Sequence, residues 1–181
     1  KALSLFLVFI MTFGIVAIGI KEMPHTHAEA QTLTENNFVY EIINEKAVIV
    51  DYADKQSTDE IIIPDTLGDY PVKEIAAEAF KNSAFSAITI PASVTAIGEG
   101  AFAECVGLTS INIPAGVTRL EKDVLRNTGL TSIEIPASVN YIGTYAFRDC
   151  ESLTEVKILY PEFTIESNTF TNMAAPVPTM T

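Results

Sequence analysis

A short apolar motif recurs along this chain at a nearly constant interval, and it constrains the fold more than any other feature. Each copy of Ile-x-Ile-Pro is followed by a second apolar pair and then by a large apolar residue, usually the Phe of an Ala-Phe step. That large residue stands at positions 80, 102, 125, 147 and 170, so the spacings are 22, 23, 22 and 23 residues. A period of this length is typical of repeat proteins, in which each unit buries its apolar edge against its neighbours. The four copies are Ile61–Pro64, Ile88–Pro91, Ile111–Pro114 and Ile133–Pro136, and Val156–Ile158 is a weaker fifth.

Each repeat combines a strand with a return segment. The alternation of Ile111 and Ile113 is typical of a strand, and Pro114, which lacks an N–H group, ends the ladder. Val117 and Leu120 lie three residues apart, which fits either one turn of a tight helix or a short second extended piece. Stacked coils of this size are expected to pair their equivalent strands in parallel.

The full pattern, Leu-x-x-Ile-x-Ile-Pro-x-x-Val-x-x-Ile/Leu-x-x-x-Ala-Phe, resembles the BspA-like leucine-rich repeat family over about residues 38–170. The resemblance implies a solenoid that is mainly β, with short helical or irregular segments on the convex side and a curved parallel sheet on the concave side. It also implies a bacterial surface protein that acts in adhesion or protein binding. The asparagine of the general leucine-rich repeat is absent, because Ser93, Gly116 and Ser138 hold its position.

The two ends of the chain differ from the repeats. Lys1, an apolar run to Ile20 and the sequence Ala28-Glu29-Ala30 are typical of a secretory signal peptide, with cleavage after Ala30. The run is also long enough to span a bilayer, so a retained membrane anchor is the alternative. We predict a signal peptide over 1–30, an N-terminal cap hairpin within 31–60, repeats of 22–23 residues over 61–172, and a tail over 173–181 beyond which the natural protein can continue.

Composition excludes several classes of function. The net charge of -12 repels phosphate, which argues against nucleic-acid binding. Both His residues precede position 30, so the cleaved chain has none. Ser-His-Asp and Cys-His mechanisms and His-based zinc sites are therefore excluded within it. We expect neither intrinsic catalysis nor a cofactor or metal.

Three groups of residues have both a structural and a functional interpretation. The repeated Phe residues are expected to form a core spine rather than a ligand site. Cys105 and Cys150 lie two repeats apart, roughly 10 Å, which exceeds the reach of a disulfide, so we predict two buried thiols. The acidic residues near the cap match no calcium loop, and we favour a solvated acidic rim over a calcium site. This rim comprises Asp51, Asp54, Asp59, Glu60, Asp65 and Asp69.

The interpretation that we favour is a secreted or cell-surface module that binds a protein or peptide outside the cell. The alternative is a structural stalk or anchor that displays a further, possibly catalytic, domain beyond residue 181. Contact with a membrane is expected only through the N-terminal segment, if it is not cleaved. Because side chains alternate along a strand, the residues on either side of the first Ile of each motif should face solvent.

These outward residues form our candidate binding face on the concave sheet. They are short or charged and include no Trp, Tyr or Arg, so we expect a shallow surface of modest affinity per module that suits an extended partner. Binding by the loops or by the acidic cap is the alternative location. The candidate residues are Thr89, Ser110, Asn112, Ser132, Glu134, Glu155 and Lys157.

Overall fold

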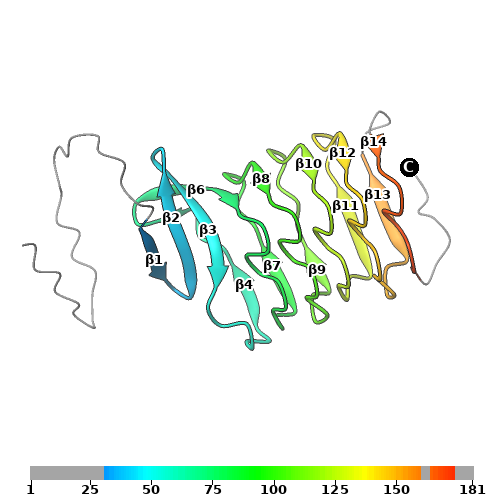
Figure 1. Cartoon of the computed structure of the whole chain (residues 1–181), viewed down its shortest axis with the longest axis horizontal. Coiled ribbons are helices and arrows are strands. Elements are labelled where there is room, and N and C mark those ends of the chain that lie inside the picture. Colours follow the sequence, from blue (N-terminus) through cyan, green and yellow to red (C-terminus); the bar gives the residue numbers. More distant parts are fainter. Residues whose placement is uncertain (1–30, 160–163, 174–181) are drawn as a thin grey trace, which may run out of the picture.

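The computed structural model describes residues 31–159 and 164–173, and these residues form a row of stacked coils that begins with a β-sheet cap (Figure 1). Equivalent segments of successive coils lie side by side along the row, as the repeat predicts. In chain order the strands are β1 Thr32–Glu35, β2 Phe38–Ile43, β3 Lys46–Tyr52, β4 Glu60–Ile62, β5 Thr66–Leu67, β6 Tyr70–Ile75, β7 Ala87–Thr89, β8 Ala96–Ile97, β9 Ser110–Ile111, β10 Arg119–Leu120, β11 Ser132–Ile135, β12 Tyr141–Ile142, β13 Glu155–Ile158 and β14 Thr164–Ile165.

The Ile-x-Ile segments form the first parallel ladder, which we call the Ile ladder. It consists of β4, β7 and β9, then β11 and β13, with β9 and β11 lying next to each other. The pairing aligns Ile61 with Ile88 and Ile88 with Ile111, and it aligns Ile133 with Val156. The repeat therefore predicted both the parallel pairing and its register.

The second apolar pair of each repeat forms another parallel ladder, which we call the second ladder. It consists of β6 and β8, then β10, β12 and β14. Leu120 therefore lies on a short strand and Val117 lies just before it, and neither is on a helical turn. The described part of the chain contains no helix, so the segments away from the sheet are irregular there and not helical.

A third set of segments, which we call the turn ladder, completes each coil. It consists of residues 76–82, 98–104, 121–127, 143–149 and 166–172, whose main chains hydrogen-bond from one coil to the next. Phe80 N donates to Ala101 O at 2.9 Å, and Phe102 N donates to Val124 O at 3.0 Å. Two residues in each turn adopt a left-handed conformation, for example Asp123 at φ 55° and Asn127 at φ 54°. Each coil is therefore bound to its neighbours on three sides.

The predicted Phe spine lies inside the stack. Phe80, Phe102 and Phe147 are fully buried, and Leu125 takes the place of Phe between the last two. The rings of Phe80 and Phe102 stack at a centroid distance of 5.4 Å, and those of Phe147 and Phe170 stack at 5.3 Å. Phe170 is only partly buried, because it belongs to the last described coil. The interpretation of these rings as core is confirmed.

The N-terminal cap closes two sides of the first coil. Strands β2 and β3 form the predicted hairpin, joined by Asn44 and Glu45 in left-handed conformations that suit a tight two-residue turn. The unpredicted strand β1 extends this sheet, and β3 pairs in parallel with β6 of the second ladder. The Tyr52 N–H donates to Ala79 O at 3.1 Å on the turn ladder. The cap therefore protects edges that would otherwise be open to other strands.

The long first repeat contains a small extra hairpin. Strands β5 and β6 pair around Gly68 and Asp69, both of which have positive φ. A Cβ on Gly68 would lie 2.7 Å from the hydroxyl of Tyr40, so the hairpin packs closely on the cap. Gly68 and Asp69 are exposed, so the extra residues of this repeat form a turn at the surface.

Both cysteines are buried free thiols, as predicted. Cys105 Sγ donates to Phe80 O at 3.0 Å, and Cys150 Sγ donates to Leu125 O at 3.1 Å. Each thiol therefore bonds to the coil before its own.

No helix of membrane-spanning length and hydropathy occurs in the described residues. The predicted signal segment, 1–30, lies outside them, as does most of the predicted tail. The predicted segment boundaries remain predictions.

Candidate functional site

The outward side of the Ile ladder brings all seven candidate residues onto one face. The register places Ala87 beside Ser110, Ser132 beside Glu155, and Glu134 beside Lys157. All seven side chains are exposed, while the Ile and Val side chains between them point into the core. The strands that carry the face lie side by side from coil to coil (Figure 1), so the sequence predicted which of these side chains face solvent.

Some charges on this face are already paired between coils. Lys157 Nζ lies 2.8 Å from a carboxylate oxygen of Glu134, and this hydrogen bond raises the pKa of Lys157. Thr89 Oγ1 donates to Glu60 at 3.4 Å. The charge of the last coils on this face is thus partly neutralised, and among the candidate residues there Glu155 has no ion pair in the described part of the chain.

Asn112 has a structural role that the sequence did not indicate. Its Oδ1 accepts a hydrogen bond from Ile90 N at 2.7 Å, and its Nδ2 donates to Ile90 O at 2.8 Å. The side-chain amide thereby extends the pairing of β7 and β9 beyond the end of β9. A partner can still contact the exposed Asn112, but replacing this residue also removes two bonds between coils.

The second ladder carries an Arg and a Tyr that the sequence analysis did not select. The guanidinium carbon of Arg119 lies 3.7 Å from the ring centroid of Tyr141, and its Nε donates to Glu121 at 2.8 Å. Beside Arg119 is a hollow of about 120 Å³ over the small side chain of Ala96. Applying the alternation rule to the second apolar pair would have identified these residues, because each precedes a buried Ile or Leu.

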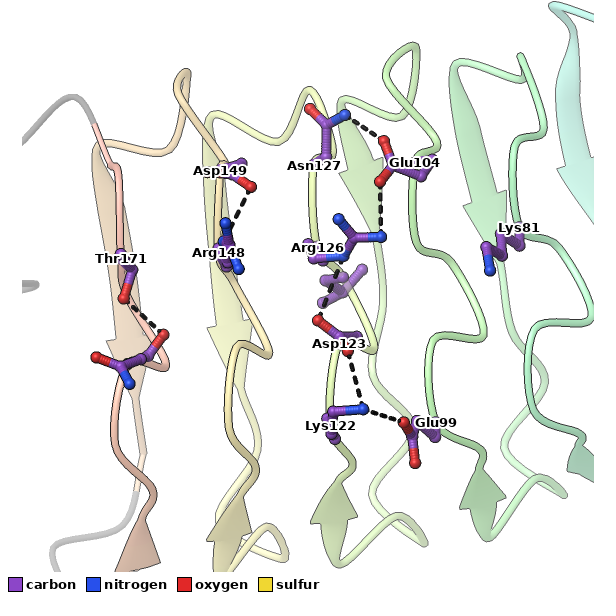
Figure 2. Close-up of polar contacts among 12 residues, drawn as sticks. Lys81, Glu99, Glu104, Lys122, Asp123, Arg126, Asn127, Arg148, Asp149 and Thr171 are labelled. Carbon is purple, nitrogen blue, oxygen red and sulfur yellow. Dashed lines mark hydrogen bonds and ion pairs between the residues drawn. The ribbon is translucent and has the colours of Figure 1, made fainter.

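The turn ladder carries a chain of ion pairs between coils (Figure 2). Lys122 Nζ lies 2.6 Å from Glu99 and 3.4 Å from Asp123. Arg126 lies 2.7 Å from Glu104 and 3.3 Å from Asp123. These contacts join two successive coils and pair the charges on their turns, so they stabilise the stack and leave little free charge for a ligand there.

The acidic residues of the cap form no metal site that the structure supports. Within residues 31–159 and 164–173, no three His, Cys, Asp or Glu side chains come together as metal ligands. Asp51 instead pairs with Lys55 at 2.8 Å. The observed contacts give no support to the calcium alternative.

Comparisons with known proteins agree with this architecture. The family model for the BspA type leucine rich repeat region matches residues 73–176 in six copies. A leucine rich cell surface protein from Faecalibacterium prausnitzii A2-165 has 30% identity and a TM-score of 0.70, over 78% of this chain and 37% of that chain. The leucine-rich repeat protein of T. pallidum has 26% identity and a TM-score of 0.66, over 78% of this chain and 67% of that one.

A leucine-rich repeat protein from Bacteroides capillosus has 26% identity and a TM-score of 0.62, over 70% of this chain and 97% of that one. No curated protein matches the sequence significantly. The chain spans only 37% of the length of the Faecalibacterium protein, so most of that protein has no counterpart in this chain. With the family model matching more than half of its residues, the chain belongs to the BspA type leucine-rich repeat family.

Proposed function

We propose that the chain is a protein-binding module outside the cell, secreted or held at the cell surface, with no catalytic activity of its own. The observation that carries the proposal is the exposed face of the Ile ladder, which runs across successive coils with short or charged side chains. Such a face offers a long, shallow surface, which suits an extended protein or peptide better than a small molecule. The similarity to a bacterial cell surface protein supports the location.

A structural stalk is the second candidate function. The chain covers 37% of the Faecalibacterium cell surface protein, which shows that repeats of this kind occur within longer polypeptides. In that case the coils would hold another domain away from the cell. Sequencing the native gene downstream of residue 181 separates the two, because a catalytic or wall-anchoring domain there favours the stalk.

The binding proposal is tested with residues 31–181 immobilised and exposed to surface proteins of host or neighbouring cells. The test variant is Ser110→Arg with Ser132→Arg, since both side chains are exposed on the Ile ladder and neither has a side-chain hydrogen bond in the described part of the chain. Asn112 is left unchanged because it joins two coils. We expect the variant to lose the captured partner while its circular dichroism stays unchanged.

The matched control is Ala92→Arg with Ala137→Arg. Ala92 and Ala137 are also exposed, and the two substitutions add the same charge as the test variant, but these positions lie at the corner after the Ile ladder. Retained binding in the control with lost binding in the test variant supports the Ile ladder. Equal binding by both variants would remove this face as the site and leave the loops or the acidic cap.

A further inference from the structure

The repeats alternate in length, and the extra residue always falls at the same corner of the coil. Ile88 to Ile111 is 23 residues, Ile111 to Ile133 is 22, and Ile133 to Val156 is 23. The long coils have two residues between the buried Cys and the following Leu, whereas the short coils have one residue between Ser or Thr and the next large side chain. The short stretches are Ser83–Phe85 and Thr128–Leu130, and the long ones are Cys105–Leu108 and Cys150–Leu153.

This alternation leaves a notch between two long coils. Val106 is exposed at the first long corner, to 66%, and Glu151 and Ser152 are exposed at the second. Between them lies the short corner at Gly129, which has no side chain. A hollow of about 160 Å³ opens there, with Val106 on one side and Glu151 and Ser152 on the other. The notch therefore follows from the repeat lengths, independently of the charges around it.

The size of the notch limits what can occupy it. Sites for small molecules enclose about 300–1,000 Å³, so 160 Å³ is too small for such a ligand. An apolar cavity of about 150 Å³ holds one benzene molecule, which shows that this volume suits a single side chain. The notch can thus anchor one residue of a larger partner.

The chemistry of the walls indicates which residue that is. Asp149 and Glu151 line the notch, and no Lys or Arg is among its lining residues. Asp149 already contacts Arg148 at 3.2 Å and Asn172 at 2.7 Å. Glu151 has neither an ion pair nor a side-chain hydrogen bond within residues 31–159 and 164–173. Its carboxylate is therefore available to a cation from outside.

The apolar wall and the carboxylate together match a long side chain with a cationic end. Lysine has a flexible four-carbon stem that packs along apolar surface while its ammonium group stays at the polar end. Its stem would lie against Val106 and its three N–H donors would reach Glu151. The net charge of -12 also favours the approach of basic partners.

We propose that the notch between Val106 and Glu151 is a subsite that anchors a lysine side chain of an extracellular protein or peptide partner. The assignment rests on the proposed binding function and adds a second contact point to it, at the corner beside the Ile ladder. It also gives the alternating repeat length a role, because coils of equal length would leave no such notch.

The experiment uses the full chain and a defined probe. The probe is the peptide acetyl-Gly-Ser-Lys-Ser-Gly-amide, and its control carries norleucine, which has an uncharged stem of similar length. Proton–nitrogen NMR follows the amide signals of Gly129 and Ser152 during titration. We expect saturable shifts of weak, millimolar affinity with the lysine peptide and none with the norleucine peptide.

Two variants that each remove one negative charge distinguish binding in the notch from general electrostatic attraction to the acidic protein. Glu151→Gln should weaken the binding of the lysine peptide about tenfold, which corresponds to a loss of about 1.4 kcal/mol of binding free energy. Glu45→Gln, which removes an exposed carboxylate in the cap turn, should leave the affinity unchanged. Equal affinity for both peptides, equal weakening by both variants, or no saturable shift at Gly129 and Ser152 would overturn the proposal.

The same variants distinguish this proposal from the function on which it rests. Capture of an extracellular partner that is lost in Glu151→Gln supports both. Capture that is unaffected by Glu151→Gln keeps the binding function and overturns the notch as its anchor. Peptide binding without capture of any partner supports the lysine subsite and contradicts the binding function.

Discussion

Single side chains hold neighbouring coils together in this protein, in three different ways. Phe102 packs its ring on Phe80, Cys105 donates a hydrogen bond to the main chain of the preceding coil, and Asn112 bonds to both polar groups of Ile90. Each contact crosses 22 to 25 residues of sequence. A change at one residue therefore affects an interface between two coils.

Phe102→Ala is expected to lower the free energy of unfolding by about 3–5 kcal/mol, since truncating a fully buried ring leaves a cavity. Phe170→Ala should have a smaller effect, because Phe170 is partly buried and stacks on one ring, that of Phe147. Urea unfolding of both variants measures the difference. Equal losses would contradict a linear stack in which a terminal coil has one neighbour.

Alkaline pH is expected to destabilise the fold through Cys105. Burial raises the pKa of this thiol from 9.0 to about 12. Below about pH 9 the thiol is neutral in both states, and the stability is fully present. Between about pH 9 and pH 12 the unfolded chain loses the proton while the folded chain keeps it, so the free energy of unfolding falls by up to about 1.4 kcal/mol per pH unit.

Urea unfolding on either side of pH 9 measures this effect. Cys105→Ser is the matched control, because Ser83 holds the equivalent position in another coil. The serine variant should show a shallower decline with pH. If both proteins decline alike, Cys105 is not the cause.

At the scale of the element, the Ile ladder was predictable, the second ladder was one of two alternatives that the sequence allowed, and the turn ladder was not predictable. The alternation around Ile88 and Ile111 and its exact recurrence predicted the Ile ladder with its register. The turn ladder hydrogen-bonds its main chain across coils, but residues such as Asp123 and Asn127 resemble an ordinary solvated turn in sequence. Nothing in these residues indicated that their main chains pair from coil to coil, so the turn ladder became evident only in the structure.

The candidate site shows the same limit. The outward residues of the Ile ladder followed from side-chain alternation alone, whereas the contact of Asn112 with Ile90 depends on how far one strand extends past its neighbour. Arg119 and Tyr141 were overlooked because the second apolar pair also fitted a helical turn, so the alternation rule was not applied to this segment. Once the segment is known to be a strand, Arg119 and Tyr141 are recognised as outward-facing neighbours on adjacent coils.

Arg126 is expected to stabilise the turn ladder. It lies between Glu104 and Asp123, both less than 30% exposed, so Arg126→Gln leaves Glu104 without its cation and leaves Asp123 with Lys122 alone. We expect a loss of about 1 kcal/mol that becomes smaller at high salt, as for partly exposed ion pairs. Thermal unfolding at low and high salt measures it. Lys46→Gln, at an exposed cap position, should change little, and an equal loss there would point to net charge instead.

At the scale of the whole molecule, stability should vary along the stack. A central coil has a neighbour on each side, and the cap covers the first coil through β3 and Tyr52. The coil that contains β14 has one described neighbour. The two ends of the stack are therefore expected to differ in stability, and the end at β14 is expected to be the less stable one.

Hydrogen exchange is expected to follow this order. Amides of Phe102 and Leu125 should exchange most slowly, and those of Glu166 and Thr171 should exchange fastest among the hydrogen-bonded ones, because local opening begins where the contacts are fewest. Exchange of the native protein, read by NMR, measures it. A uniform rate along the stack would mean that the coils open only together.

Export is a prediction for the whole chain as well. The apolar run followed by Ala28-Glu29-Ala30 predicts a mature N-terminus at Gln31. N-terminal sequencing of the exported protein gives the answer directly. A protein that still carries residues 1–30 would instead be one anchored in the membrane through its N-terminal segment.

The three-sided hydrogen bonding between coils also determines how the molecule responds to mechanical force. Neighbouring strands pair along the stacking direction, so these bonds lie nearly parallel to the row of coils. A pull on the two ends of the chain therefore loads the bonds of a terminal coil first and opens them one after another. Each coil of 22 or 23 residues that detaches releases roughly 75 Å of extended chain. Under tension the stack would lengthen in steps, and the coils that remain would keep their surfaces intact.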